Sequence, residues 1–170
     1  MLVEQRKNLP LHHRVAMMTA SLGGVGCVPK IPGTVGSLVT LGAMWGSRDV
    51  RIGHMLVWSV GALVFSILAW WSVAIAERYW GNDSQRIVID ECIGMVMVIL
   101  MLEVCDKTML LRWEYTALLG FSIFRVFDIL KPFPLSWLNA QQGAFFVLAD
   151  DILAGIMAVS ITEGIWLIWQ

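Results

Sequence analysis

The sequence predicts an all-α, single-domain integral membrane protein, and three observations point to this fold class. Of the 170 residues, 58% are hydrophobic and 15% are charged, against about 45–50% and about 25% in soluble domains. The stretch 55–76 contains no charged residue over a length that suits a membrane span. Glycines, prolines and charges divide the rest into further apolar segments. We therefore expect a bundle of about five to six helices, the first one or two short or re-entrant; a very apolar soluble bundle is the alternative.

The N-terminal residues 1–14 are polar and basic, and no apolar segment of signal-peptide type follows them. We expect an N-terminal arm over 1–14 and a single helical domain over 15–170. The three cysteines form no CxxC pair, which argues against a zinc knuckle. The net charge of −1 gives no reason to expect a nucleic-acid partner.

The first half of the domain is predicted to hold two short helices and one long one. A short helix over 15–22 should stop at Gly23 and Gly24, and the Gly/Pro-rich segment 24–37 is predicted to be a loop. Thr34 would cap a helix over 35–46, whose length of about 18 Å is short of a bilayer core of about 30 Å. The uncharged segment 55–76 is the clearest membrane span.

The second half is predicted to contain three longer apolar helices over 87–102, 109–130 and 145–169. Pro132 and Pro134 end the middle one, because proline cannot continue a helix. The segment 132–142 then connects it to the last helix.

Acidic residues interrupt each of these three helices near one end. Because successive helices run in opposite directions, the segment 24–37 and all five carboxylates should meet at one end of the bundle. The five are Asp90, Glu91, Asp128, Asp150 and Asp151. Eight of the twelve Lys and Arg residues fall on this same side, which the positive-inside rule assigns to the cytoplasm.

Five converging carboxylates repel one another unless a cation neutralises them. Ligands that are all oxygen favour Mg²⁺ over zinc, so the five carboxylates are candidate metal ligands. The same end of the bundle offers groups that suit a phosphate, including backbone N–H groups at a helix N-terminus. The phosphate-binding candidates are Lys30, Gly33, Thr34, Gly36, Ser37, Arg125 and Lys131. Carboxylates, Mg²⁺, phosphate binders and a bilayer together favour metal-assisted hydrolysis of a lipid phosphate.

The sequence offers little for phosphatase mechanisms that pass through a covalent enzyme intermediate. No cysteine is followed by the spacing of a thiol phosphatase, and no DxDxT or Walker motif is present. The three histidines lie outside the acidic segments. Attack of an activated water on phosphorus, with a carboxylate as base, fits the residues that remain.

Four motifs resemble the phosphatidylglycerophosphatase A family, a family of Mg²⁺-dependent enzymes of the bacterial inner membrane. They are PGTVGS at 32–37, IVIDECIG at 87–94, FRVFDILKPFP at 124–134 and ADDILAG at 149–155, in the order found in the family. The resemblance implies hydrolysis of phosphatidylglycerophosphate to phosphatidylglycerol, a step of phospholipid biosynthesis. It also implies a multi-pass protein whose site faces the cytoplasm, and it is compatible with a homo-oligomer.

Matched position by position, the resemblance assigns catalysis to Asp90, Glu91, Asp128 and Asp151, with Asp150 as a further metal ligand. The family's Gly-rich stretch before the acidic pair is reduced here to Gly143. Two alternatives use the same carboxylates. One is a membrane carrier of cations or protons, and the other is a non-catalytic relative that binds a lipid or a metal.

Overall fold

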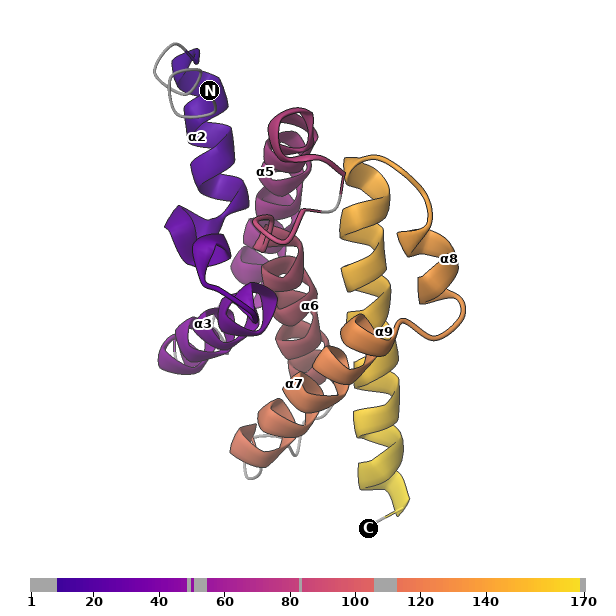
Figure 1. Cartoon of the computed structure of the whole chain (residues 1–170). Helices are drawn as coiled ribbons and strands as arrows, with labels where there is room; N and C mark the ends of the chain where they lie inside the picture. The colour runs from indigo at the N-terminus through magenta and orange to yellow at the C-terminus, as the bar shows by residue number, and fades with distance from the viewer. Residues whose placement is uncertain (1–8, 49, 51–54, 83, 106–112, 169–170) are drawn as a thin grey trace.

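The computed structural model describes residues 9–48, 50, 55–82, 84–105 and 113–168, and the regular structure within them is entirely helical (Figure 1). The prediction of an all-α fold is therefore confirmed. The elements are α2 (Leu11–Ala20), the 3₁₀ helix η2 (Leu22–Cys27), α3 (Pro32–Gly46), α5 (Met55–Trp80), α6 (Ile89–Cys105), α7 (Trp113–Leu130), α8 (Leu135–Asn139) and α9 (Ala144–Ile168).

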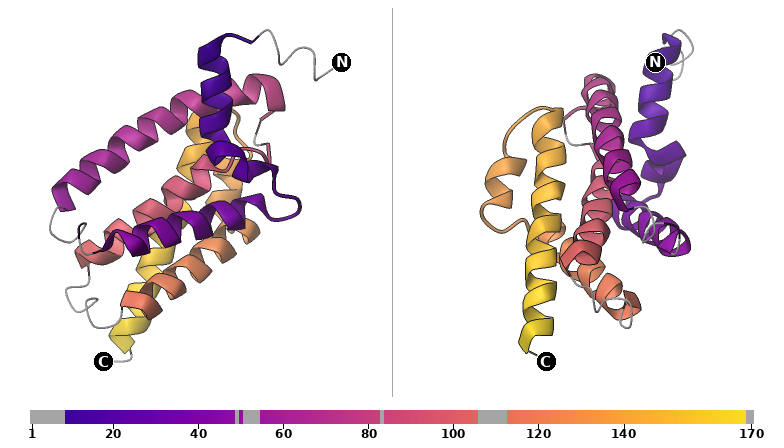
Figure 2. Two further views of the ribbon diagram at one scale, coloured as in Figure 1. Left: turned by 90° about the vertical axis from the view of Figure 1, so that its left-hand side faces the viewer. Right: turned by 180° about the vertical axis from the view of Figure 1, so that it is seen from behind.

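Helix α6 lies at the centre of the bundle and packs against α9, α3, α5 and α7 (Figure 1). Its largest contact is with α9. The five-residue helix α8 flanks α9, while α2 packs on α5 at the opposite side of the bundle (Figure 2). Ten of the seventeen residues of α6 are buried, so this helix is the central one against which the other helices pack.

Two glycines allow α6 and α9 to cross closely. A Cβ atom added to Gly94 would lie 2.9 Å from the carbonyl oxygen of Asp151, and one added to Gly155 would lie 3.0 Å from that of Gly94. Small residues at such crossings let two backbones approach and are common where apolar helices pack in membranes. The crossing therefore fixes how α6 and α9 sit along each other.

Two helices, α5 and α9, are long and apolar enough to cross a membrane. They contain 26 and 25 residues with mean hydropathy 1.9 and 2.0. At 1.5 Å per residue, each exceeds a bilayer core of about 30 Å. Within their most apolar windows only 28% and 50% of the residues are buried inside the protein. Helix α5 agrees with the candidate span predicted over 55–76, and α9 agrees with the last helix predicted over 145–169; that they cross a membrane stays a prediction.

Several helix boundaries differ from those expected, and the largest difference lies in the predicted loop 24–37. Helix α3 begins at Pro32 rather than at residue 35, so Gly33 and Thr34 belong to its first turn and Thr34 is not a cap. Proline suits the first helical position because its missing N–H group would have no partner there and its φ is already helical. Helix η2 also occupies part of the segment, kinked where Gly23 and Gly24 have φ of 67° and 107°.

Other boundaries extend past the apolar runs. Helix α2 begins at Leu11, inside the predicted arm; residues 1–8 lie outside the described part of the chain. Helix α5 continues through Glu77 and Arg78 to Trp80, because a helix can leave an apolar environment without ending. The segment 132–142, predicted as a connection only, contains α8. The predicted start of a helix at residue 109 also lies outside the described residues.

Candidate metal and phosphate site

The predicted acidic residues meet where the ends of α6 and α7 approach the second turn of α9. Oxygen atoms of Asp90, Glu91 and Asp151 lie within 4.8 Å of one another, which we call the first acidic group. Oxygen atoms of Asp128, Asp150 and Asp151 also lie within 4.8 Å of one another, which we call the second acidic group. Asp151 belongs to both groups. The structure thus brings together all five carboxylates, while their roles stay a prediction.

The crossing of α6 and α9 explains why Asp90 and Asp151 meet. Gly94 follows Asp90 by four residues, and Gly155 follows Asp151 by four residues, so each aspartate lies one turn before a crossing glycine. Side chains four apart share one face of a helix. The sequence reasoning missed these glycines, although the repeated D-x-x-x-G spacing was a readable signal for them.

The first acidic group is largely buried, with Glu91 partly exposed, and two of its oxygen atoms lack partners within the described residues. Asp90 and Asp151 are 5% and 3% exposed. Among the described residues, Glu91 Oε2 and Asp151 Oδ1 are buried without a hydrogen-bond partner. No ion pair within this part of the chain joins Glu91 or Asp151 to a basic side chain. Leaving a buried carboxylate uncompensated costs several kcal/mol. An oxygen-only donor set with orphaned lone pairs fits a hard divalent cation.

The second acidic group is already compensated by two basic side chains. Arg125 Nη1 lies 2.6 Å from Asp128 Oδ2, and Lys131 Nζ lies 3.5 Å from Asp128 Oδ1. Lys131 also forms an ion pair with Asp150. Asp150 is 4% exposed, so this pair is largely shielded from water. The cation-poor part of the site is therefore the first acidic group.

Lys131 stays charged at neutral pH. Burial alone would lower its pKa, but the hydrogen bond to Asp150 and the negative charges of Asp151 and Asp128 outweigh burial. The pKa of Lys131 is consequently well above its ordinary value. The ammonium group thus adds a lasting positive charge beside the carboxylates.

The first turns of α3 cover the site from a third direction. A Cβ atom at Gly33 would overlap Glu91 Oε1 and would lie 3.2 Å from Arg125 Nη2, so the α3 backbone rests directly on both groups. Arg125 Nη1 donates a hydrogen bond to Ser37 Oγ (3.2 Å), and Ser37 Oγ donates one to the Gly33 carbonyl (2.9 Å). The first N–H groups of a helix have no partner within it. The helix α3 therefore presents donors beside Arg125.

The remaining phosphate-binding candidates differ in how they contact the rest of the site. Gly36 is buried against Val88 and accepts a hydrogen bond from Cys92 Sγ (3.7 Å), so it packs α3 onto α6. Thr34 lies in the first turn of α3. Lys30 is exposed with φ of 75°, and no contact in the described ranges connects it to the carboxylates. Ser37 is fully buried, so its hydroxyl orients Arg125 rather than facing a ligand.

Comparisons with known proteins show which family this chain resembles. The model of the family "Phosphatidylglycerophosphatase A" matches residues 18–166. A "Phosphatidylglycerophosphatase A" of Escherichia coli is 32% identical over 143 residues, covering 81% of this chain and 76% of that protein. The protein of the same name from Haemophilus influenzae is 29% identical over 161 residues, covering 94% and 93%. A "Putative phosphatidylinositol-3-phosphatase" of Bacteroides thetaiotaomicron is 32% identical over 149 residues, covering 85% and 90%. No solved structure matches the chain.

Proposed function

The chain belongs to the phosphatidylglycerophosphatase A family and is a phosphatase, and on this premise we propose that it hydrolyses phosphatidylglycerophosphate to phosphatidylglycerol and inorganic phosphate. The observation that supports this most is the first acidic group, a buried set of carboxylate oxygens with orphaned lone pairs beside two basic side chains. Such a set can hold a divalent cation and a phosphate side by side.

We assign the cation to Asp90, Glu91 and Asp151, and we propose Mg²⁺ because every donor is a carboxylate oxygen. When bound, Mg²⁺ would neutralise charge on the phosphate oxygens and acidify water. Asp128 and Asp150 then serve mainly to hold Arg125 and Lys131 in place through the ion pairs described above.

We assign the phosphate to Arg125, Lys131 and the N-terminal turn of α3. Arg125 Nε is buried and has no hydrogen-bond partner in the described ranges, so this donor is unused. Water attacks phosphorus while a carboxylate of the site accepts the water proton. The bond from phosphorus to the glycerol oxygen breaks, and that oxygen takes up a proton, from the protonated carboxylate or from water, to leave as the hydroxyl of phosphatidylglycerol. Charge on the phosphate oxygens is stabilised by the two basic side chains and the helix N-terminus.

We further propose a multi-pass protein of the bacterial cytoplasmic membrane whose site faces the cytoplasm. Helices α5 and α9 supply the length and hydropathy of two spans. The sequence predicts that eight of the twelve Lys and Arg residues fall on the side of the acidic residues, and the positive-inside rule assigns that side to the cytoplasm. A lipid headgroup at the membrane surface would then meet the site directly.

The name of the Bacteroides relative supplies a second candidate substrate, phosphatidylinositol 3-phosphate. Both lipids carry a phosphate monoester, so the acidic site would treat the reacting group alike. Rates on the two lipids, measured side by side with the purified protein, decide between these substrates.

The test of the proposed reaction is release of inorganic phosphate by the purified chain with and without Mg²⁺. Asp90→Asn should lower the rate by roughly 100-fold or more, because metal assistance supplies several kcal/mol and each 1.36 kcal/mol is tenfold. The matched control is Glu114→Gln, an exposed carboxylate in the first turn of α7, which should keep the wild-type rate.

Near-normal turnover by Asp90→Asn would remove this residue from the mechanism. Phosphate release that ignores Mg²⁺ would remove the cation. Ion flux into liposomes without lipid hydrolysis would instead favour a carrier, and metal binding without either activity would favour a non-catalytic relative.

A further inference from the structure

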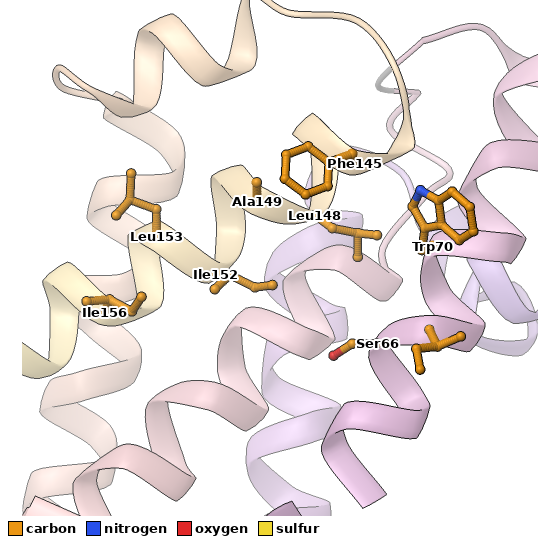
Figure 3. Close-up of a pocket in the computed structure, with 9 residues that line it drawn as sticks. Ser66, Trp70, Phe145, Leu148, Ala149, Ile152, Leu153 and Ile156 are labelled. Atoms are coloured by element: carbon orange, nitrogen blue, oxygen red, sulfur yellow. The ribbon is translucent and has the colours of Figure 1, made fainter. Parts of the chain in front are cut away.

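Two adjoining cavities line helix α5 away from the acidic site. The first, of about 430 Å³, lies between α5 and α9 and is lined by Trp70, Phe145 and Ile156 among others (Figure 3). The second, of about 530 Å³, lies between α5 and α6 and reaches Ser59 and Cys105. Ser66 and Ile152 line both cavities, so the two form one continuous groove.

The walls of this groove offer almost no unsatisfied polar group. The two serine hydroxyls are committed to the backbone of α5: Ser66 Oγ donates to the carbonyl of Ala62 (2.9 Å) and Ser59 Oγ donates to that of Met55 (3.0 Å). The other side chains that line the groove are aliphatic, aromatic or sulfur-containing. A polar ligand would lose hydrogen bonds to water here without regaining them, whereas a hydrocarbon loses nothing.

The length of the groove suits a single hydrocarbon chain. Along α5 it extends from Ser59 to Trp70, about 16 Å at 1.5 Å per residue and close to half of a bilayer core of about 30 Å.

The groove is separate from the acidic site. Asp151 lies beside Asp90 of α6. Leu148 and Ile152 of α9 instead line the groove (Figure 3). The buried cluster that contains Ile89, Ile93 and Leu148 lies between them. Buried side chains thus separate the groove from the acidic site. The groove nevertheless opens at the same end of the bundle, where Trp70 and Phe145 are 52% and 65% exposed.

We propose that this groove binds one acyl chain of a bilayer phospholipid that is not the substrate molecule. Both α5 and α9, which form its walls, are the candidate membrane spans, so the surrounding medium at this depth is lipid. The chain enters between Trp70, whose indole ring suits the level of the headgroups, and Phe145, and its end lies near Ser59 and Cys105. The proposal rests on the membrane placement proposed above and is independent of the hydrolytic reaction.

The test uses a phosphatidylcholine with a diazirine at the end of one acyl chain, mixed with the full chain in detergent at a few-fold molar excess and irradiated. Because phosphatidylcholine has no phosphate monoester, it is not hydrolysed as substrate. We expect saturable adducts on residues 59–63 or 101–105, located by peptide mass spectrometry.

Ser66→Phe fills the point where the two cavities join and should lose most of these adducts. Leu63→Trp, an exposed residue that lines the second cavity, is a second variant with less effect on folding. The matched control Val64→Phe changes an exposed residue of the same helix that lines neither cavity, and it should label like wild type.

Adducts spread equally over both faces of α5 would overturn the proposal. So would equal labelling of Leu63→Trp and Val64→Phe. Phosphate release from phosphatidylglycerophosphate, added to a separate portion of the same purified protein, separates the two proposals: adducts in the groove without any such phosphate release support the groove and contradict the reaction.

Discussion

Asp151 is the side chain on which the site depends, because it joins the two acidic groups. It is 3% exposed, and its Oδ1 has no hydrogen-bond partner within the described residues. Selection for stability alone would not retain a buried carboxylate, since replacing buried charges by apolar residues is often neutral or stabilising. Its presence is explained if the residue is retained for ligand binding. The site also requires a glycine at position 33 of α3, because any side chain at Gly33 would occupy the space of the Glu91 carboxylate.

Replacing Gly33 by alanine should lower phosphate release by about 10–100-fold, because a displacement near 1 Å of a reacting group costs about that much. The added methyl group must push aside Glu91 or Arg125. Gly42→Ala is the control on the same helix, since nothing lies within 4 Å of its Cβ position. Equal rates for the two variants would show that the contact between α3 and Glu91 has no part in the reaction.

At the scale of elements, the crossing of α6 and α9 determines the distance between Asp90 and Asp151. A Cβ atom at Gly94 would lie 2.6 Å from Phe124 Cζ on α7 and 2.9 Å from the backbone of α9. Gly94 thus lies where α6, α7 and α9 pack together. Because both aspartates lie one turn from this point, any separation of the helices also opens the first acidic group.

Gly94→Ala should destabilise the protein by about 1–3 kcal/mol through overpacking. For a chain of this size each kcal/mol corresponds to a fall of about 2–4 °C in Tm. Thermal unfolding in detergent, followed by tryptophan fluorescence, measures the change. Gly164→Ala on α9 is the control, because its Cβ position is open, and its Tm should be unchanged or slightly higher. A Gly94→Ala protein as stable as wild type would contradict the close crossing.

At the scale of the whole molecule, the sequence predicts that successive helices run in alternating directions. This alternation was enough to place Asp90, Asp128 and Asp151 at one end of the bundle, without any knowledge of side-chain positions. The pairing of Lys131 with Asp150 could not be foreseen because it depends on side-chain geometry between α7 and α9. The groove escaped prediction for a similar reason, since it arises from the angle between α5 and its neighbours.

A native cysteine tests the membrane placement. Cys27 lies in η2 and is exposed. With Cys105 replaced by serine, a membrane-impermeant maleimide should label Cys27 from the cytoplasmic side of sealed vesicles. Labelling of Cys27 only from the opposite side would rule out the proposed arrangement.

The central claim is that the first acidic group holds a divalent cation, and titration of the purified protein with Mn²⁺, followed by electron paramagnetic resonance, tests it without relying on catalysis. We predict saturable binding that Mg²⁺ displaces. Asp151→Asn should weaken it by at least the roughly 10–100-fold that changes around a metal site cost, and Glu114→Gln should leave it unchanged. Wild-type affinity for Mn²⁺ in the Asp151→Asn protein would contradict the claim.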